Sequence, residues 1–121
     1  MSDPVAFVKT LAARFKEVGS LLEEHVTDNM GEILPHLFFG DLTRYILTLV
    51  AAVTAGGGLE PRRELREILD FLEESFSTGD RVLQELISVS LLENLPRAGE
   101  EGSQVRSMLG TALSAELRRM G

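Results

Sequence analysis

Polar side chains interrupt the most apolar stretch of the chain, residues 32–55, and they are the first candidates for chemistry. Glu32 and His36 are four residues apart, and Asp41 and Arg44 are three apart. In a helix these spacings place each pair on one face. A core needs none of these side chains for packing. The first pair has the composition of a metal site, and the second has the spacing of an intrahelical ion pair.

A metal site in this region would combine His36 and Glu32 with a third ligand such as His25 or Asp28. The sequence contains only two histidines, and it has no HExxH motif and no repeated ExxH pair. We therefore expect no metal and no cofactor. Two interpretations of His36 remain, a partly buried helix residue bonded locally and a member of a polar patch that faces a partner.

Nucleophilic catalysis has no clear candidate either. The chain has no cysteine, and no serine stands in a glycine-flanked elbow followed by a plausible base and acid. The glycines at 56–58 lack the Lys-Ser/Thr that completes a phosphate-binding loop, which favours a flexible connector. We expect a protein that is not an enzyme.

Length and composition are those of one globular domain, residues 1–121. Hydrophobic residues make up 44% and charged residues 26% of the chain. The absence of cysteine and of a signal-peptide pattern predicts a cytoplasmic protein. The apolar run from Tyr45 to Ala55 is shorter than the roughly 20 residues that cross a bilayer, so no membrane span is expected.

Apolar spacing predicts an all-α fold, a single-domain bundle of about five helices around a central apolar helix. The first expected helix covers about 4–25 and is interrupted at Gly19-Ser20. The central helix runs from Glu32, with Pro35 in its first turn, to the glycines at 56–58. An amphipathic helix follows from about Pro61 to a turn at 77–80, then a mostly buried helix that ends before Pro96, and a last helix over about 103–119.

The distribution of charge is more informative than any motif. The net charge is −7, which argues against nucleic acid as a partner. Acidic residues without intervening Lys or Arg occupy two spans, one between Lys16 and Arg44 and one between Arg66 and Arg81. If these spans lie side by side, they form one negative face that would attract a basic partner. A surface that only confers solubility is the alternative.

Glu93 and Asn94 form a second polar cluster, near the end of the fourth expected helix. Asn94 is suited to capping that end, whereas Glu93 is unfavourable beside the negative end of the helix dipole. We therefore expect Glu93 to have a specific partner, inside the fold (Arg44 or His36) or outside it.

Residues 28–41 and 87–95 resemble a small bacterial family of unknown function. Its members carry a similar G-E-hydrophobic-L-P-H stretch and, further on, a similar F/L-L-E-N-L stretch. Proteins of that type look like the immunity proteins of polymorphic or contact-dependent toxin systems, which are small, acidic, cytoplasmic and without catalytic motifs. The resemblance implies that the shared polar positions either contact a toxin or hold the fold.

The sequence-based hypothesis is a protein-binding immunity protein that occludes a cognate toxin with a basic face. Its candidate partner-binding residues are Glu24, Asp28, Glu32, His36, Asp41, Glu67, Asp70, Glu73 and Glu74, and its candidate structural polar residues are Arg44, Glu93 and Asn94. The alternative hypothesis is a regulatory or scaffold subunit that self-associates through the apolar faces of the central and fourth helices.

Overall fold

The computed structural model describes residues 2–120, and all regular structure in this range is helical. The elements are α1 (Pro4–Arg14), α2 (Lys16–Asp28), α3 (Pro35–Thr54), α4 (Leu59–Thr78), α5 (Arg81–Ser90), the 3-10 turn η1 (Leu92–Asn94), α6 (Val105–Met108) and α7 (Thr111–Met120). The predicted all-α single-domain bundle is confirmed. The helices in the described range number seven rather than about five, because two of the expected helices are each broken once.

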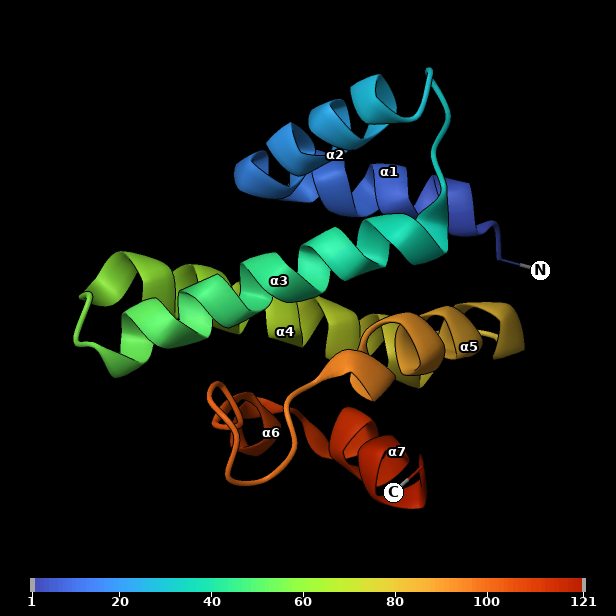
Figure 1. The fold of residues 1–121 in the computed structure, drawn as a ribbon. Helices are drawn as coiled ribbons and strands as arrows, with labels where there is room; N and C mark the ends of the chain where they lie inside the picture. The colour runs from blue at the N-terminus through green and yellow to red at the C-terminus, as the bar shows by residue number, and fades with distance from the viewer. Residues whose placement is uncertain (1, 121) are drawn as a thin grey trace.

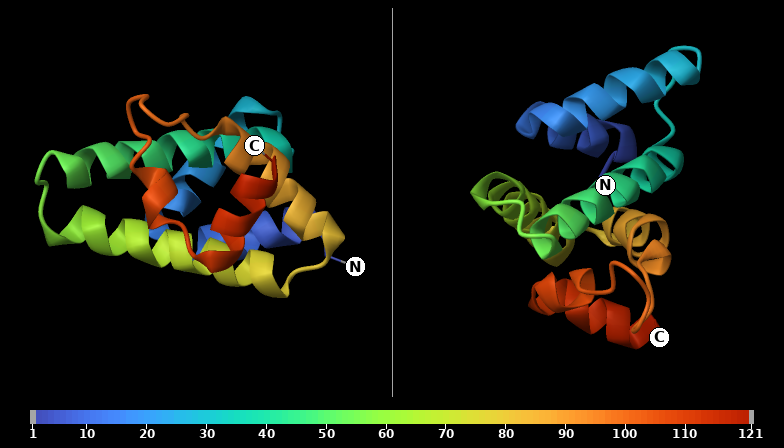
Figure 2. Two further views of the ribbon diagram at one scale, coloured as in Figure 1. Left: turned by 90° about the horizontal axis from the view of Figure 1, so that it is seen from below. Right: turned by 60° about the vertical axis from the view of Figure 1, so that its left-hand side comes forward.

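The helices form three layers (Figures 1 and 2). The α1–α2 pair covers one side of a middle layer made of α3, α4 and α5, and α6 and α7 lie on the opposite side. The predicted centre of the bundle is α3, which packs against α1, α2, α4 and α5. The long α3–α4 hairpin extends beyond the other elements at one end of the molecule.

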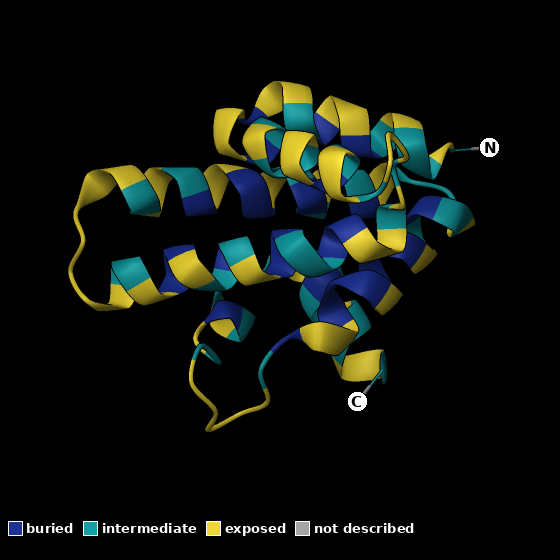
Figure 3. Cartoon of the chain, turned by 45° about the horizontal axis from the view of Figure 1, so that its top comes forward, coloured by how far each residue is buried: buried dark blue, intermediate teal, exposed yellow. Residues whose placement is uncertain are grey.

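The core lies between these layers, and α3 is its largest contributor (Figure 3). Six of its hydrophobic residues are buried: Phe38, Phe39, Leu42, Ile46, Leu49 and Val50. The Phe7 ring on α1 stacks on Phe39 at 6.2 Å and on Phe71 of α4 at 6.0 Å between centroids. Burial of such side chains is the main favourable term in folding, and here it joins α1 to the middle layer.

The first expected helix breaks at Phe15, not at Gly19-Ser20. The backbone of Phe15 is extended, with φ −125° and ψ 119°, and its buried ring meets Phe71 edge-on at 5.9 Å. Gly19 instead lies inside α2, where a Cβ atom would be 3.0 Å from the carbonyl oxygen of Ala12. Gly19 therefore allows α1 and α2 to approach closely, and burial of the Phe15 ring sets the break.

The helix α3 contains 20 residues, which is long and apolar enough to cross a membrane by length and composition alone. The shorter apolar run seen in the sequence is thus part of a longer apolar helix, and the length argument against a span does not hold. In the bundle, seven residues of α3 are buried against neighbouring helices.

The helix α5 ends at Ser90, before Pro96 as expected, and continues as the 3-10 turn η1. The last expected helix is divided into α6 and α7 at residues 109–110. The expected stop after α3 is confirmed, since Gly56 and Gly58 have φ of 81° and 95°, a region that favours glycine.

Asp80 begins α5 and also holds the start of the chain. Its Oδ1 accepts a hydrogen bond from the backbone N–H of Leu83 at 3.1 Å, and its Oδ2 accepts one from the backbone N–H of Ser2 at 2.5 Å. The bond from Ser2, and then that from Leu83, lowers the pKa of the Asp80 carboxyl below its usual value.

Asp80→Asn is expected to lower the thermal unfolding midpoint near neutral pH and to flatten its fall in acid. The folded-state pKa lies below the unfolded value of about 3.9, so the stabilisation is present above that value and is lost as the pH falls through the folded pKa. Melts of both proteins followed by circular dichroism at about pH 7, 4 and 2 should show a shrinking difference. A difference that is the same at every pH would contradict this assignment.

Candidate functional site

The turn between α2 and α3 has an unusual backbone. The N–H of Gly31 bonds to the carbonyl of Val26 at 2.8 Å, which is the long-range bond of a Schellman helix end. Met30 precedes Gly31 and has φ 55°, a left-handed conformation that glycine or asparagine usually occupies at this position. The helix end thus places a large apolar residue where a small one is the rule.

Buried His25 fixes this turn from inside. Only 2% of His25 is exposed, and its Nε2 accepts a hydrogen bond from the backbone N–H of Leu34 at 2.9 Å. A neutral ring that accepts through Nε2 carries its proton on Nδ1, which lies 3.9 Å from Oδ2 of Asp41. The Asn29 side chain donates to the carbonyl of His25 at 2.7 Å. His25 therefore joins the end of α2 to the residue that precedes α3.

A hollow of about 330 Å³ lies between α2 and α3, and it is lined mainly by polar side chains. Its walls are Leu21, Glu24, His25, Asp28, Asp41, Arg44, Tyr45 and Thr48. Arg44 pairs with Asp41, as the sequence predicts. Glu24 and Asp28 are exposed and have no cationic partner within residues 2–120. The hollow is therefore negatively charged and suits a basic side chain.

Tyr45 closes one wall of this hollow and connects it to α4. Burial, followed by the hydrogen bond that its hydroxyl donates to Glu64, raises the pKa of Tyr45 above its ordinary value. The phenol therefore remains protonated and ties α3 to α4.

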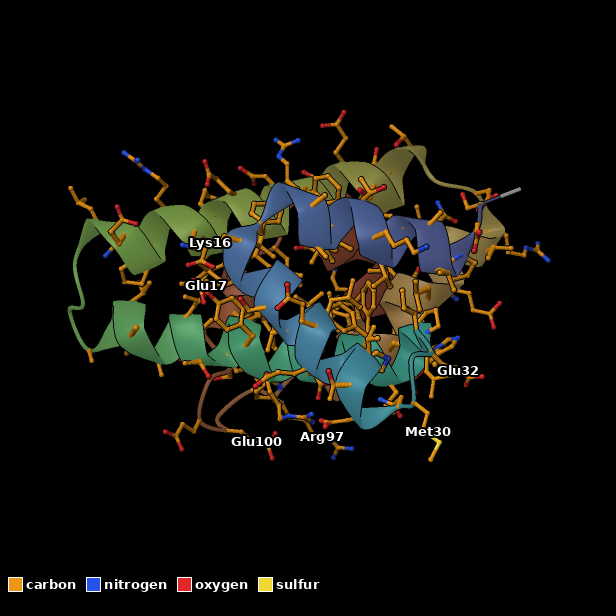
Figure 4. All side chains as sticks on the ribbon, turned by 90° about the horizontal axis from the view of Figure 1, so that it is seen from above. Lys16, Glu17, Met30, Glu32, Arg97 and Glu100 are labelled. Atoms are coloured by element: carbon orange, nitrogen blue, oxygen red, sulfur yellow. The ribbon has the colours of Figure 1, made fainter. Side chains whose placement is uncertain are left out.

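Apolar side chains are exposed beside the carboxylates. Met30 is 97% exposed, Leu37 55% and Leu34 39%. Figure 4 shows the Met30 sulfur pointing away from the molecule, with Glu32 in the same turn. Leu37 and Asp41 are one helical turn apart on α3, so the apolar and acidic groups adjoin. We call Glu24, Asp28, Met30, Glu32, Leu34, Leu37 and Asp41 the turn surface.

The other predicted acidic residues are on α4 and line a different hollow. Glu67, Asp70 and Glu74 border a space of about 520 Å³ together with Arg14 and Phe71. Asp70 also pairs with Arg66 at 3.0 Å. The two hollows have no residue in common, so the acidic spans line separate hollows.

The sequence predicts that Glu73 faces a partner, but its carboxylate accepts hydrogen bonds from another helix of the same chain. Its Oε2 and Oε1 accept hydrogen bonds from the backbone N–H groups of Ala112 and Leu113, at 2.7 and 3.0 Å. These are donors in the first turn of α7, and Gly110 before that helix has no capping side chain. A Cβ atom at Gly110 would lie 2.5 Å from Cδ of Glu73, so glycine admits the carboxylate.

Three expectations about polar partners are also corrected. Glu32 precedes α3, so Glu32 and His36 do not share a helical face. His36 bonds through Nδ1 to the hydroxyl of Ser90 on α5, rather than locally. Glu93 is exposed and pairs with neither Arg44 nor His36. Asn94 does serve the end of α5, since its amide donates to the carbonyl of Ser90 at 3.1 Å.

Sequence reasoning missed the apolar half of the turn surface. The signal was Met30, an apolar residue between turn-forming Asn29 and Gly31. Leu34 and Leu37 fit the helical spacing of buried neighbours such as Phe38, so the sequence pattern alone does not distinguish them from core residues. No three His, Asp or Glu side chains within residues 2–120 lie close enough together to hold a metal ion.

A family model for a domain of unknown function, DUF7674, matches residues 8–120. The chain belongs to the DUF7674 family. This agrees with the resemblance to a family of unknown function noted in the sequence, and the match covers both segments on which that resemblance rests. No curated protein and no solved structure matches this DUF7674 chain. The family description assigns no activity to the DUF7674 domain, so its function is argued from the site.

Glu73→Ala is expected to lower the free energy of unfolding by about 1–2 kcal/mol, the usual effect of removing a helix-capping side chain. Glu74→Ala is the matched control, because Glu74 is exposed and its carboxylate makes no hydrogen bond within the described residues. We expect the control to change stability by less than about 0.5 kcal/mol. Urea unfolding followed by circular dichroism measures both, and equal effects would refute the cap.

Proposed function

We propose that this chain is a protein-binding domain of the immunity type, which neutralises a toxin by covering its active surface. The observation that supports the proposal is the negatively charged hollow between α2 and α3, in which Glu24 and Asp28 lack a cationic partner among the residues that the structure describes. The protein would act in the cytoplasm without catalysis, metal or cofactor.

The charge of the hollow favours a basic partner. The protein carries a net charge of −7, so its long-range field attracts cationic surfaces and repels nucleic acid and anionic lipid. Near contact, the carboxylates of Glu24, Asp28 and Asp41 accept hydrogen bonds from lysine or arginine side chains. Electrostatic complementarity of this kind raises association rates and orients the complex.

The α4 group of Glu67, Asp70 and Glu74 has a different part in the proposal. It borders a separate hollow that also contains Arg14, and one of its members is already paired with Arg66. Its charges add to the long-range field and therefore to steering. They are not proposed to contact the toxin together with the turn surface.

By covering the active surface of the toxin, this chain would neutralise it without catalysing any reaction. The turn between α2 and α3 lies at one end of the molecule (Figure 1), and a partner docked on the turn surface would be covered by the end of α2 and the start of α3. The toxin would be one whose active surface is basic, such as a surface that handles nucleic acid.

The test is co-expression with the C-terminal domain of the polypeptide encoded beside this chain. We expect that domain to arrest growth alone and to be harmless in the presence of this protein. The double variant Glu24→Lys/Asp28→Lys should slow association by about tenfold or more at low salt, with a smaller effect at high salt.

Glu67→Lys/Glu74→Lys is the matched control, since it makes the same change in net charge on the α4 group. It should slow association much less than the first variant. A neighbouring domain that is harmless alone, or equally toxic with this protein present, would refute the immunity function. Equal effects of the two double variants would refute the role of the α2–α3 hollow.

A second candidate function is self-association, and one observation favours it. A groove of about 610 Å³ between α3 and the segment before α6 is lined by apolar residues that include Leu47, Val50 and Ala51. A second copy seated there would extend the apolar contacts of the central helix. Sedimentation is expected to reveal a dimer that dissociates on dilution, and a monomer at all concentrations would refute this candidate.

A further inference from the structure

The backbone of Met30 follows from the Schellman end of α2, but no contact within residues 2–120 explains why a large apolar side chain stands there. Its side chain is 97% exposed and joins no part of the core. Its left-handed conformation is unfavourable for a side chain with a Cβ atom, and glycine would relieve it. A left-handed methionine lowers the stability of the free protein, so we expect its side chain to contact another molecule.

The turn that carries Met30 is held rigidly. The bond from Gly31 to Val26 fixes the helix end, at 2.8 Å. The bond from Leu34 to buried His25 fixes the far side of the turn, at 2.9 Å. Because both sides of Met30 are fixed in the free protein, the backbone of the turn has little conformational freedom to lose on binding.

The surroundings of Met30 define what can bind there. Leu34 and Leu37 supply further exposed apolar surface. Asp28 and Glu32 are exposed carboxylates two residues before and after Met30, and Glu24 is one helical turn before Asp28 on α2. A central apolar anchor with a polar rim is the usual arrangement of a protein interface. A second copy would present like charges to this rim, and an anionic lipid surface would be repelled.

We propose that Met30 is the anchor of a preformed recognition turn, which docks on an apolar face bordered by lysine and arginine side chains. Leu34 and Leu37 extend the apolar contact, and Glu24, Asp28 and Glu32 pair with the basic border. This inference rests on the proposed protein-binding function and names the surface and the partner chemistry that it uses.

The decisive variant is Met30→Gly, because glycine suits the left-handed backbone and preserves the fold. Its thermal midpoint should equal or exceed that of the wild type. Its affinity for the neighbouring toxin domain should nevertheless fall at least tenfold. The matched control is Leu59→Ala, since Leu59 is 80% exposed at the start of α4, outside the turn surface. The control should bind as the wild type does.

A synthetic helical peptide of leucine and lysine, with leucines along one face, tests the surface chemistry without the toxin. We expect it to bind the wild type and Leu59→Ala equally, and to bind Met30→Gly and Glu24→Lys/Asp28→Lys at least tenfold more weakly. Calorimetry measures these affinities.

The outcomes separate the two proposals. If the wild type binds the toxin domain and Met30→Gly binds equally well, the anchor is refuted while the immunity function stands. If the wild type does not bind the toxin domain, the immunity function is refuted, and the peptide result decides on the surface. Peptide binding that is absent, or insensitive to Met30→Gly, overturns the anchor. A dimer that only Met30→Gly dissociates would identify a second copy as the occupant and overturn the proposed partner chemistry.

Discussion

The hydrogen bond from the Leu34 N–H to the buried imidazole of His25 is the constraint on which the turn surface depends. It ties the end of α2 to the residue that precedes α3, in addition to the bonds that the backbone of the turn makes with itself. A buried acceptor without a partner is unfavourable by about 1–3 kcal/mol, so the buried imidazole of His25 requires this bond from the turn. The same ring packs edge-on against Phe38 at 5.6 Å, which couples the turn to the core. A buried residue, His25, therefore positions the exposed side chains of the turn.

His25 is one of several polar side chains that bond to the backbone of an element other than their own. Glu73 on α4 caps α7, and Asp80 at the start of α5 binds the N–H of Ser2. Helix ends leave N–H groups without intrahelical partners, and in this small bundle other elements supply some of the missing acceptors. The acidic residues that the structure describes therefore fall into two groups, those bonded within the fold and those free on the surface. A carboxylate such as that of Glu73 is committed to the fold, whereas Glu24 and Asp28 remain available on the surface.

The sequence predicts the fold class, the central position of α3 and several helix ends, because these follow from apolar spacing and from glycine at 56–58. It misplaces the break in the first helix, because burial of Phe15 against Phe71 is a tertiary contact that no local pattern contains. It includes Glu73 among the partner-facing acids for the same reason, since the donors that it caps lie about forty residues away. The pair Asp41–Arg44 is predicted correctly because three-residue spacing is local. Met30 is missed because an exposed methionine has no periodic signal, and only the backbone conformation distinguishes it.

The capping of α7 from α4 has a consequence for the order in which the molecule assembles and comes apart. With only ten residues, α7 is too short to be stable as an isolated helix, and its first-turn acceptor belongs to another element. The layer of α6 and α7 can thus become ordered only after the middle layer has formed. In the native protein, brief detachment of this layer needs less free energy than opening the centre of the bundle. Amide hydrogens of α7 should consequently exchange with solvent before those of α3.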